Sequence, residues 1–116
     1  MKEVEFIIRT NMYSKTKEVL SEKGFAAFTS KEILGRGKKT SVFEIDGDEE
    51  KEIVQPTLVA KRLMVIWVDD EKCDELIHAI IEVNQTGSPG DGKIFVSDLD
   101  DGIRIRTGET GEDVVL

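Results

Sequence analysis

Residues 86–96 combine several residue types that bind phosphate groups in proteins. They include Gly87, Gly90 and Gly92, followed by Lys93 just before an apolar run. Glycines let the backbone approach a ligand closely, and successive N–H groups can form a nest for an anion. Lys93 adds a positive charge where this glycine-rich loop ends. The pattern predicts a phosphate site, and an ordinary helix-to-strand turn is the alternative interpretation.

The spacing of Gly87, Gly92 and Lys93 also fits the nucleotide-binding P-loop. Ile94, however, stands where a P-loop needs Ser or Thr to hold magnesium. A P-loop also leads from a strand into a helix, whereas this segment follows a helical pattern and opens a strand. These differences exclude the P-loop interpretation.

Arg104 and Arg106 supply a second source of positive charge. They lie two residues apart in a segment, 102–106, that we expect to form a short strand. Residues two apart in a strand point to the same face of the sheet. The sequence therefore predicts a basic pair that, together with Lys93, binds phosphate.

The composition limits the class of protein and of partner. The chain has 116 residues, the size of one domain, and a formal net charge of −8 from 16 Lys and Arg against 24 Asp and Glu. Such an acidic chain is not expected to bind nucleic acid. Basic residues nonetheless cluster locally, at 36–39, 61–62, 93 and 104–106.

Neither membrane insertion nor secretion is predicted. The sequence contains no apolar run of about 18 residues, which a transmembrane helix would need. Its charged residues 1–5 lack the apolar core of a signal peptide, so we expect a cytoplasmic protein.

Cys73 is the single cysteine and cannot form an internal disulfide, and His78 lacks sequence neighbours that would suggest a metal or catalytic site.

Hydrophobic periodicity predicts two similar units in a single domain, 1–116. The first has a strand at 2–9, a helix at 11–24 and a strand at 25–34. The second has a strand at 57–68, a helix from 69 to near 87 and a strand at 93–98. The second helix carries an apolar stripe formed by Cys73, Leu76, Ile77, Ile80 and Ile81.

Two strand–helix–strand units of this length predict an α+β sandwich of the ferredoxin-like βαβ-βαβ type. Both helices would cover one face of a four-stranded antiparallel sheet. The opposite face would carry apolar side chains such as Val65 and Trp67. Because an exposed apolar sheet face is a liability, we expect another subunit to cover it.

Residues 36–57 separate the two units and show no convincing period, apart from a strand-like stretch at 42–45. A loop of about 20 residues in a small domain tends to be functional or disordered. A solvated acidic loop without a role is the alternative. The acidic tail, 108–116, is expected to be mobile.

Three landmarks occur in order along the chain: Gly35-Arg36-Gly37, the glycine-rich segment 86–96, and Arg-Ile-Arg-Thr-Gly-Glu at 104–109. With these landmarks, the whole chain resembles the nitrogen regulatory PII signal proteins. The resemblance implies a homotrimer with ATP or ADP in clefts between subunits. It also implies a long T-loop at 36–57 that docks on target proteins, and sensing of 2-oxoglutarate.

The resemblance further implies which residues contact the ligands. The nucleotide-binding positions are Thr29, Gly35, Gly37, Lys38, Gly90, Asp91, Gly92, Lys93, Arg104 and Arg106. Lys61 matches the lysine that contacts 2-oxoglutarate. Lys39 lies at the other end of the loop, and we expect it to pair the effector together with Lys61. The alternative is that Lys39 is solvated, that this subunit senses only nucleotide, and that 2-oxoglutarate binds a sister subunit. Magnesium is expected to accompany ATP.

Two departures from the family pattern bear on regulation. Residues 36–57 contain no tyrosine, although the family's uridylylated tyrosine lies in the T-loop; Tyr13 is far away in sequence. Lys39 stands where a glutamine usually helps to hold magnesium and 2-oxoglutarate, and a protonated lysine cannot ligate a metal. The loop resembles the nitrogenase-associated branch, whose members act as paired sister subunits that block nitrogenase.

The favoured interpretation is a non-catalytic regulator in which nucleotide and effector select loop conformations that bind a target differently. A slow nucleotide hydrolase is one alternative, with Asp91 as the base nearest the glycine-rich loop. A PII-like regulator of another target, such as a transporter, without a 2-oxoglutarate response, is the second alternative. The sequence does not identify the target.

Overall fold

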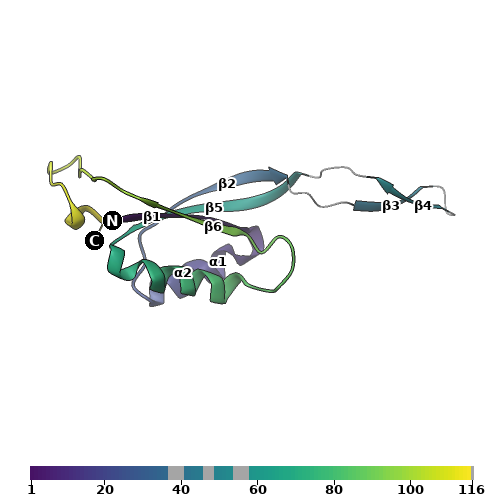
Figure 1. Ribbon diagram of the computed structural model, residues 1–116, viewed down its shortest axis with the longest axis horizontal. Helices are drawn as coiled ribbons and strands as arrows, with labels where there is room; N and C mark the ends of the chain where they lie inside the picture. The colour runs from purple at the N-terminus through teal and green to yellow at the C-terminus, as the bar shows by residue number, and fades with distance from the viewer. Residues whose placement is uncertain (37–40, 46–48, 54–57, 116) are drawn as a thin grey trace.

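The computed structural model describes residues 1–36, 41–45, 49–53 and 58–115. Its main sheet contains β1 (Lys2–Arg9), β2 (Thr29–Arg36), β5 (Leu58–Val68) and β6 (Lys93–Asp98), in the order β2-β5-β1-β6 with antiparallel neighbours. The helices α1 (Tyr13–Glu22) and α2 (Asp70–Asn84) cover one face of this sheet (Figure 1). The predicted ferredoxin-like arrangement is therefore confirmed.

Alternating side chains of the two central strands form the core. Phe6 of β1 pairs with Met64 of β5, and Val4 pairs with Ile66; all four are buried. The helices add Leu20, Leu76 and Ile80. Burying each such side chain stabilises the fold by about 1.5–3 kcal/mol. This shared core holds the ends of β1, β5 and β6 in fixed positions.

The apolar stripe of α2 differs from the prediction at its C-terminal end. Cys73, Leu76 and Ile80 are buried as expected, but Ile81 is 40% exposed. Asn84 is buried instead, because eleven residues make about three helical turns and bring it into line with Cys73.

The buried Asn84 ties the two helices together. Its Nδ2 donates to Thr16 Oγ1 of α1 at 3.2 Å and to the Ile80 carbonyl at 3.0 Å. Thr16 in turn donates to the Met12 carbonyl at 2.6 Å. A polar residue is therefore tolerated in the core because its donor group is satisfied.

The predicted strand at 102–106 is wrong. In this region the structure has an isolated bridge between Ile103 and Thr110, and residues 105–107 form a turn. The Gly108 amide donates to the Arg104 carbonyl at 2.7 Å, so the chain reverses here instead of extending. Arg104 and Arg106 consequently do not share a strand face.

The second strand is also displaced from the prediction. β2 begins at Thr29 and continues through Gly35 to Arg36, whereas the sequence pattern suggested 25–34. Phe25 is buried but belongs to the turn after α1, where its amide donates to the Leu20 carbonyl at 2.8 Å. Its apolar side chain contributes to the core without strand pairing.

The predicted T-loop contains a second, two-stranded sheet. β3 (Ser41–Ile45) pairs with β4 (Glu49–Ile53) in antiparallel register, and this hairpin projects from one end of the main sheet (Figure 1). The backbone pairing gives the segment more order than a structureless loop. The neighbouring positions 37–40, 46–48 and 54–57 lie outside the described residues.

The C-terminal segment lies at the opposite end of the main sheet from the hairpin (Figure 1). After β6, the Leu99 amide donates to the Met1 carbonyl at 3.1 Å. The segment then closes on itself through the Gly111 amide, which donates to the Gly102 carbonyl at 3.2 Å, and ends in a 3-10 helix, Glu112–Val115. Residues 99–115 therefore form a small separate cap.

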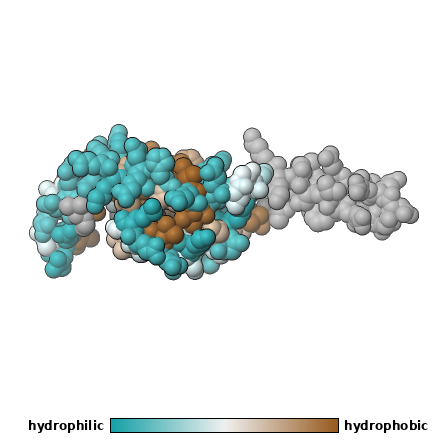
Figure 2. All heavy atoms as spheres, turned by 90° about the horizontal axis from the view of Figure 1, so that it is seen from below, coloured by the Kyte–Doolittle hydropathy of each residue, from teal (hydrophilic) through white to brown (hydrophobic). Residues whose placement is uncertain are grey.

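The two faces of the molecule differ in character. The side that carries the helices is largely hydrophilic, with hydrophobic residues gathered near its middle (Figure 2). The open sheet face carries Trp67 and Phe95, which are 45% and 55% exposed, beside the partly buried Leu63 and Val65. None of the helices in the described part of the chain is long and apolar enough to span a membrane.

Candidate functional site

The glycine-rich loop connects the end of α2 to β6 at the hairpin end of the sheet. Three glycines of this loop have positive φ values, which residues with a side chain rarely adopt: 83° at Gly87, 99° at Gly90 and 116° at Gly92. A Cβ atom added to Gly92 would lie 1.9 Å from the carbonyl oxygen of Ile7 on β1. Gly92 is therefore required by close packing on β1, independently of any ligand.

Asp91 fixes the shape of this loop. One carboxylate oxygen accepts hydrogen bonds from the Thr86 and Gly87 amides at 2.7 and 2.9 Å. The other accepts from the Thr86 hydroxyl and from Arg9 Nη1, the latter at 2.7 Å. The Thr86 hydroxyl and amide, joined by the Arg9 guanidinium and the Gly87 amide, hold the pKa of Asp91 well below its ordinary value.

These contacts give Asp91 a structural role. Both carboxylate oxygens already accept two hydrogen bonds, and the depressed pKa makes the group a poor base. A general base for hydrolysis needs a free lone pair directed at the attacking water and a pKa nearer to neutrality. The geometry therefore argues against Asp91 as the base of a nucleotide hydrolase.

The network makes a prediction for acid unfolding. Because the folded state depresses the pKa of Asp91, its stabilising contribution is complete at neutral pH and is lost as the pH falls below about 4. Asp91→Asn should lower the free energy of unfolding at pH 7, and the difference from the wild type should shrink in acid. Urea titrations across this pH range measure it.

Ser88→Ala is the matched control, since the Ser88 side chain makes no contact with Asp91 among the hydrogen bonds of the described residues. It should retain the wild-type pH dependence. A constant difference between Asp91→Asn and the wild type from pH 7 down to pH 3 would contradict the ionic role.

Two cations from the central strands converge on the loop. Arg9 Nη2 donates to the Pro89 carbonyl at 3.1 Å, and Lys61 Nζ donates to the Gly90 carbonyl at 2.8 Å. Arg9 and Lys61 are direct partners in the β1–β5 ladder, so they leave the same end of the sheet. A Cβ atom added to Gly90 would lie 3.3 Å from Arg9 Nη2 and 3.5 Å from Lys61 Nζ, so both side chains pack against this glycine.

Arg9 is a site residue that the sequence analysis missed. It stands at the end of the predicted strand 2–9, and no motif singled it out. Pairing the ends of the predicted strands 2–9 and 57–68 in antiparallel register would have placed it beside Lys61. This strand pairing was the one feature of the sequence that could have identified Arg9 as a site residue.

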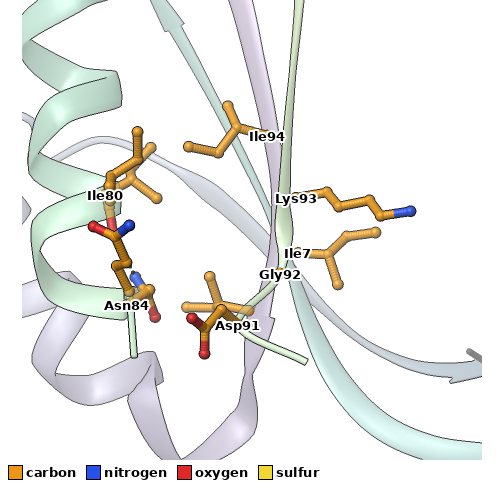
Figure 3. Close-up of a pocket in the computed structure, with 10 residues that line it drawn as sticks. Ile7, Ile80, Asn84, Asp91, Gly92, Lys93 and Ile94 are labelled. Atoms are coloured by element: carbon orange, nitrogen blue, oxygen red, sulfur yellow. Dashed lines mark hydrogen bonds between the residues drawn. The ribbon is translucent and has the colours of Figure 1, made fainter. Parts of the chain in front are cut away.

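Lys93 lies on the same sheet face as these two cations. It pairs with Ile7 of β1, two residues before Arg9, so the three side chains share the open face. Figure 3 shows Lys93 pointing away from Ile80 and Asn84. Gly35 reaches the same region from β2, where an added Cβ would lie 3.8 Å from Cγ of Lys61.

Thr29 lies at the opposite edge of the sheet. It pairs with Val65 at the start of β2, and β5 and β1 separate β2 from β6. Three strand spacings of about 4.8 Å separate β2 from β6 by roughly 14 Å, and Lys93 is displaced a further two residues along β6 from the row that contains Thr29. Within one chain, these two predicted contacts cannot reach the same phosphate group.

Arg104 and Arg106 are also separated from the loop. β6 leads away from it, from Lys93 opposite Ile7 to Asp98 opposite Lys2, and the arginines follow in the C-terminal cap (Figure 1). Arg104 donates to the Glu109 carboxylate at 3.0 Å and to the Asp113 carbonyl at 3.1 Å, while Arg106 is exposed. A ligand that contacts both groups would have to bind between two chains.

The remaining predicted contacts cannot be placed. Gly37, Lys38 and Lys39 lie outside the described residues. Among the residues that are described, His, Cys, Asp and Glu form no group suited to a metal ion. The groups that the structure does bring together on one sheet face are the cationic side chains of Arg9, Lys61 and Lys93.

A pocket of about 310 Å³ lies on the other side of the loop, toward α2 (Figure 3). Its walls include Ile8, Ile80, Ile81 and Ile94, with Asp91 beside them. The ammonium group of Lys93 points away from this pocket. The apolar pocket and the cationic surface are thus neighbouring but distinct features.

The fold and site define a ferredoxin-like α+β domain with a glycine-rich loop and three cationic side chains near the end of the sheet from which the hairpin projects. Residues 1–109 match the model of a family described as Nitrogen regulatory protein P-II. The chain belongs to this PII family, whose members are regulatory signal proteins.

Relatives with established names support the nitrogenase-associated branch. The chain is 39% identical to a "Nitrogen fixation nifHD region GlnB-like protein 2" of Methanobacterium ivanovii, with 100% of both chains covered. It is 43% identical to the corresponding nifHD1 region protein of Methanosarcina barkeri, with 97% of both covered. The structure of Bacillus subtilis GlnK is similar, with a TM-score of 0.77, 29% identity, and 97% and 96% of the two chains covered.

Proposed function

We propose that this protein is a non-catalytic regulator of nitrogen metabolism that binds ATP or ADP between the subunits of a homotrimer. One observation carries the proposal. Arg9, Lys61 and Lys93 gather on one sheet face beside the glycine-rich loop, while Arg104 and Arg106 lie at the far end of the same chain. Two chains joined head to tail would bring these halves together.

In this arrangement the chain's own groups neutralise the phosphates. Lys93 contacts them from one subunit and Arg104 and Arg106 from the next, while Gly90 and Gly92 allow close approach of the backbone. Charge-assisted contacts of this kind contribute about 1.5–3 kcal/mol each. Thr29, Gly35, Gly37 and Lys38 complete the proposed nucleotide contacts.

Magnesium would be held mainly by the nucleotide. Asp91 already accepts four hydrogen bonds, and a protonated Lys39 has no lone pair to offer a metal. Mg²⁺ commonly keeps several waters and binds through substrate phosphates. The described residues thus fit a nucleotide better than they fit a protein-bound ion.

2-Oxoglutarate is the proposed effector, bound by Lys61 and Lys39. Lys61 Nζ donates to the Gly90 carbonyl at 2.8 Å, so a carboxylate at this ammonium would change how the loop is held. Lys61 is near the start of β5, the strand that follows the hairpin in sequence. A change in its hydrogen bonding would therefore occur close to the hairpin. Effector binding would thereby alter the population of hairpin positions that bind the target.

Calorimetry tests the proposed function. With ATP present, 2-oxoglutarate should release heat on binding the wild type, and Lys61→Ala should abolish the signal. Lys72→Ala, an exposed lysine on α2, is the control and should bind normally. Absence of ATP binding to the wild type would refute the nucleotide proposal. Binding of 2-oxoglutarate only after a sister protein is added would move the effector site to that subunit.

Target recognition is assigned to the hairpin, and nitrogenase is the proposed target. Deleting residues 41–55 should abolish target inhibition while ATP affinity changes less than about threefold, because projecting loops contribute little to a core. Nitrogenase assays with and without the deletion variant measure the first effect, and calorimetry measures the second. Full inhibition by the variant would place the recognition surface elsewhere.

Tyr13 does not replace the missing T-loop tyrosine. Its hydroxyl lies 2.7 Å from Ser30 Oγ, and its ring lies under Arg62, with 4.0 Å between the guanidinium carbon and the ring centroid. It is therefore part of the packed body, away from the hairpin. We propose that ligands, and not uridylylation, regulate this subunit.

A further inference from the structure

Ile105 is an unusual surface residue. It is 99% exposed, at the tip of the turn in the C-terminal cap, and nearby Ile103 is 65% exposed. Arg104 and Arg106 flank it in sequence. A single exposed isoleucine needs no explanation, but one held at a tip between two cations is well placed to enter a pocket.

The pocket beside the glycine-rich loop offers an apolar cavity of suitable size. Its volume of about 310 Å³ corresponds to roughly ten water molecules, enough for a branched aliphatic side chain. Ile8, Ile80 and Ile94 line it, together with Ile81, which is 40% exposed. An isoleucine that entered this cavity would bury its own apolar surface and that of Ile81.

Ile105 cannot reach the pocket of its own chain. The pocket lies at the end of β6 where Lys93 pairs with Ile7, whereas the cap begins beyond Asp98, which pairs with Lys2. The two features therefore lie at opposite ends of the sheet (Figure 1). A contact between them has to join two copies, and such a head-to-tail contact can close into a ring.

Charge favours the same contact. The C-terminal end of a helix carries a partial negative charge that basic residues usually complement. The last turn of α2 contains no basic residue and includes the exposed Glu82. Arg106 is exposed next to Ile105, so a docked cap would bring positive charge to this helix end.

We propose that Ile105 of one copy inserts into the isoleucine pocket between α2 and β6 of the next copy. This docking rests partly on the proposed function, because it describes how two subunits that share a nucleotide site are held together. The docked isoleucine would hold Arg104 and Arg106 of one copy next to the glycine-rich loop of the other copy. The pocket would thereby position the two arginines that complete the proposed nucleotide site. Ile105 is thus a positioning residue for a site that is incomplete in one chain.

Sedimentation of the full-length chain provides the first test. Wild type should sediment at three times the 13.0 kDa chain mass at micromolar concentration. Ile105→Asp should shift it toward the mass of one chain, and Ile105→Val, which keeps a branched apolar side chain, should not. Circular dichroism should show the same fold in both variants, because the side chain is exposed within its own chain.

Disulfide trapping provides the second test. A variant with Ile105→Cys and Ile81→Cys should form intermolecular cross-links on oxidation without nucleotide. Each single variant, and the pair Ile105→Cys with Lys15→Cys on the exposed surface of α1, should not; the native Cys73 is buried. Cross-linking equal to that of the control pair, or unchanged sedimentation of Ile105→Asp, would overturn the docking. ATP titration of the wild type tests the nucleotide proposal separately.

Discussion

Replacing Gly92 with alanine is expected to destabilise the protein by about 3 kcal/mol, from overpacking and backbone strain together. A Cβ at this position would lie 1.9 Å from the Ile7 carbonyl oxygen, so β1 and the loop would have to separate. The φ of 116° adds strain for any residue with a side chain. Urea unfolding at a fixed protein concentration measures the loss.

Gly87→Ala is the matched control. Gly87 has a φ of 83°, but an added Cβ would meet nothing within 4 Å among the described residues. Its cost should be limited to backbone strain, about 1–2 kcal/mol. Equal costs for the two variants would show that the loop does not pack on β1 as closely as the structure indicates.

Local sequence patterns were sufficient to predict some of the helices and strands. β6 has the predicted bounds, and Cys73, Leu76 and Ile80 of the predicted apolar stripe are buried. The stripe is buried because its side chains face a single apolar layer, whereas most residues of β6 are exposed and this strand pairs only with β1 among the described strands.

The predictions failed where turn hydrogen bonds or strand pairing, and not a hydrophobic period, decide the backbone. Arg104 to Arg106 have the composition of a strand, but hydrogen bonds to the Arg104 carbonyl close a turn there. The strand β2 begins at Thr29 because pairing with β5 ends at Val65. The hairpin β3–β4 is short and its sequence is rich in acidic residues. The segment therefore lacks the clear alternation of apolar and polar residues that would have predicted two paired strands.

The candidate site was only partly accessible from sequence. Lys61, Gly90 and Asp91 were assigned through family resemblance, and the structure places them together around Arg9, which no motif marked. Asp91 anchors the loop, because its hydrogen bonds run to Thr86, Gly87 and Arg9, and its predicted contact with the nucleotide stays a prediction. Thr86 and Gly87 are close to Asp91 in sequence, whereas Arg9 is far from it and could not be found from spacing alone.

Lys93→Ala and Arg104→Ala should each weaken ATP binding by about ten- to a hundredfold, because each removes one charge-assisted phosphate contact worth about 1.5–3 kcal/mol. Lys72→Ala on α2 should leave the dissociation constant unchanged. Calorimetry with ATP measures all three variants. Unchanged affinity of both Lys93→Ala and Arg104→Ala would remove these residues from the phosphate site.

A mixture of the two variants distinguishes a shared site from a site within one chain. In a head-to-tail ring formed from equal amounts of both, about one quarter of the clefts would combine an intact Lys93 with an intact Arg104 from the neighbour. Unfolding and refolding the variants together should therefore restore wild-type affinity in that fraction of sites. If Lys93 and Arg104 served one ligand within a single chain, every site in the mixture would lack one of them. Restored binding thus requires the two halves, which the structure places at opposite ends of the chain, to meet across an interface.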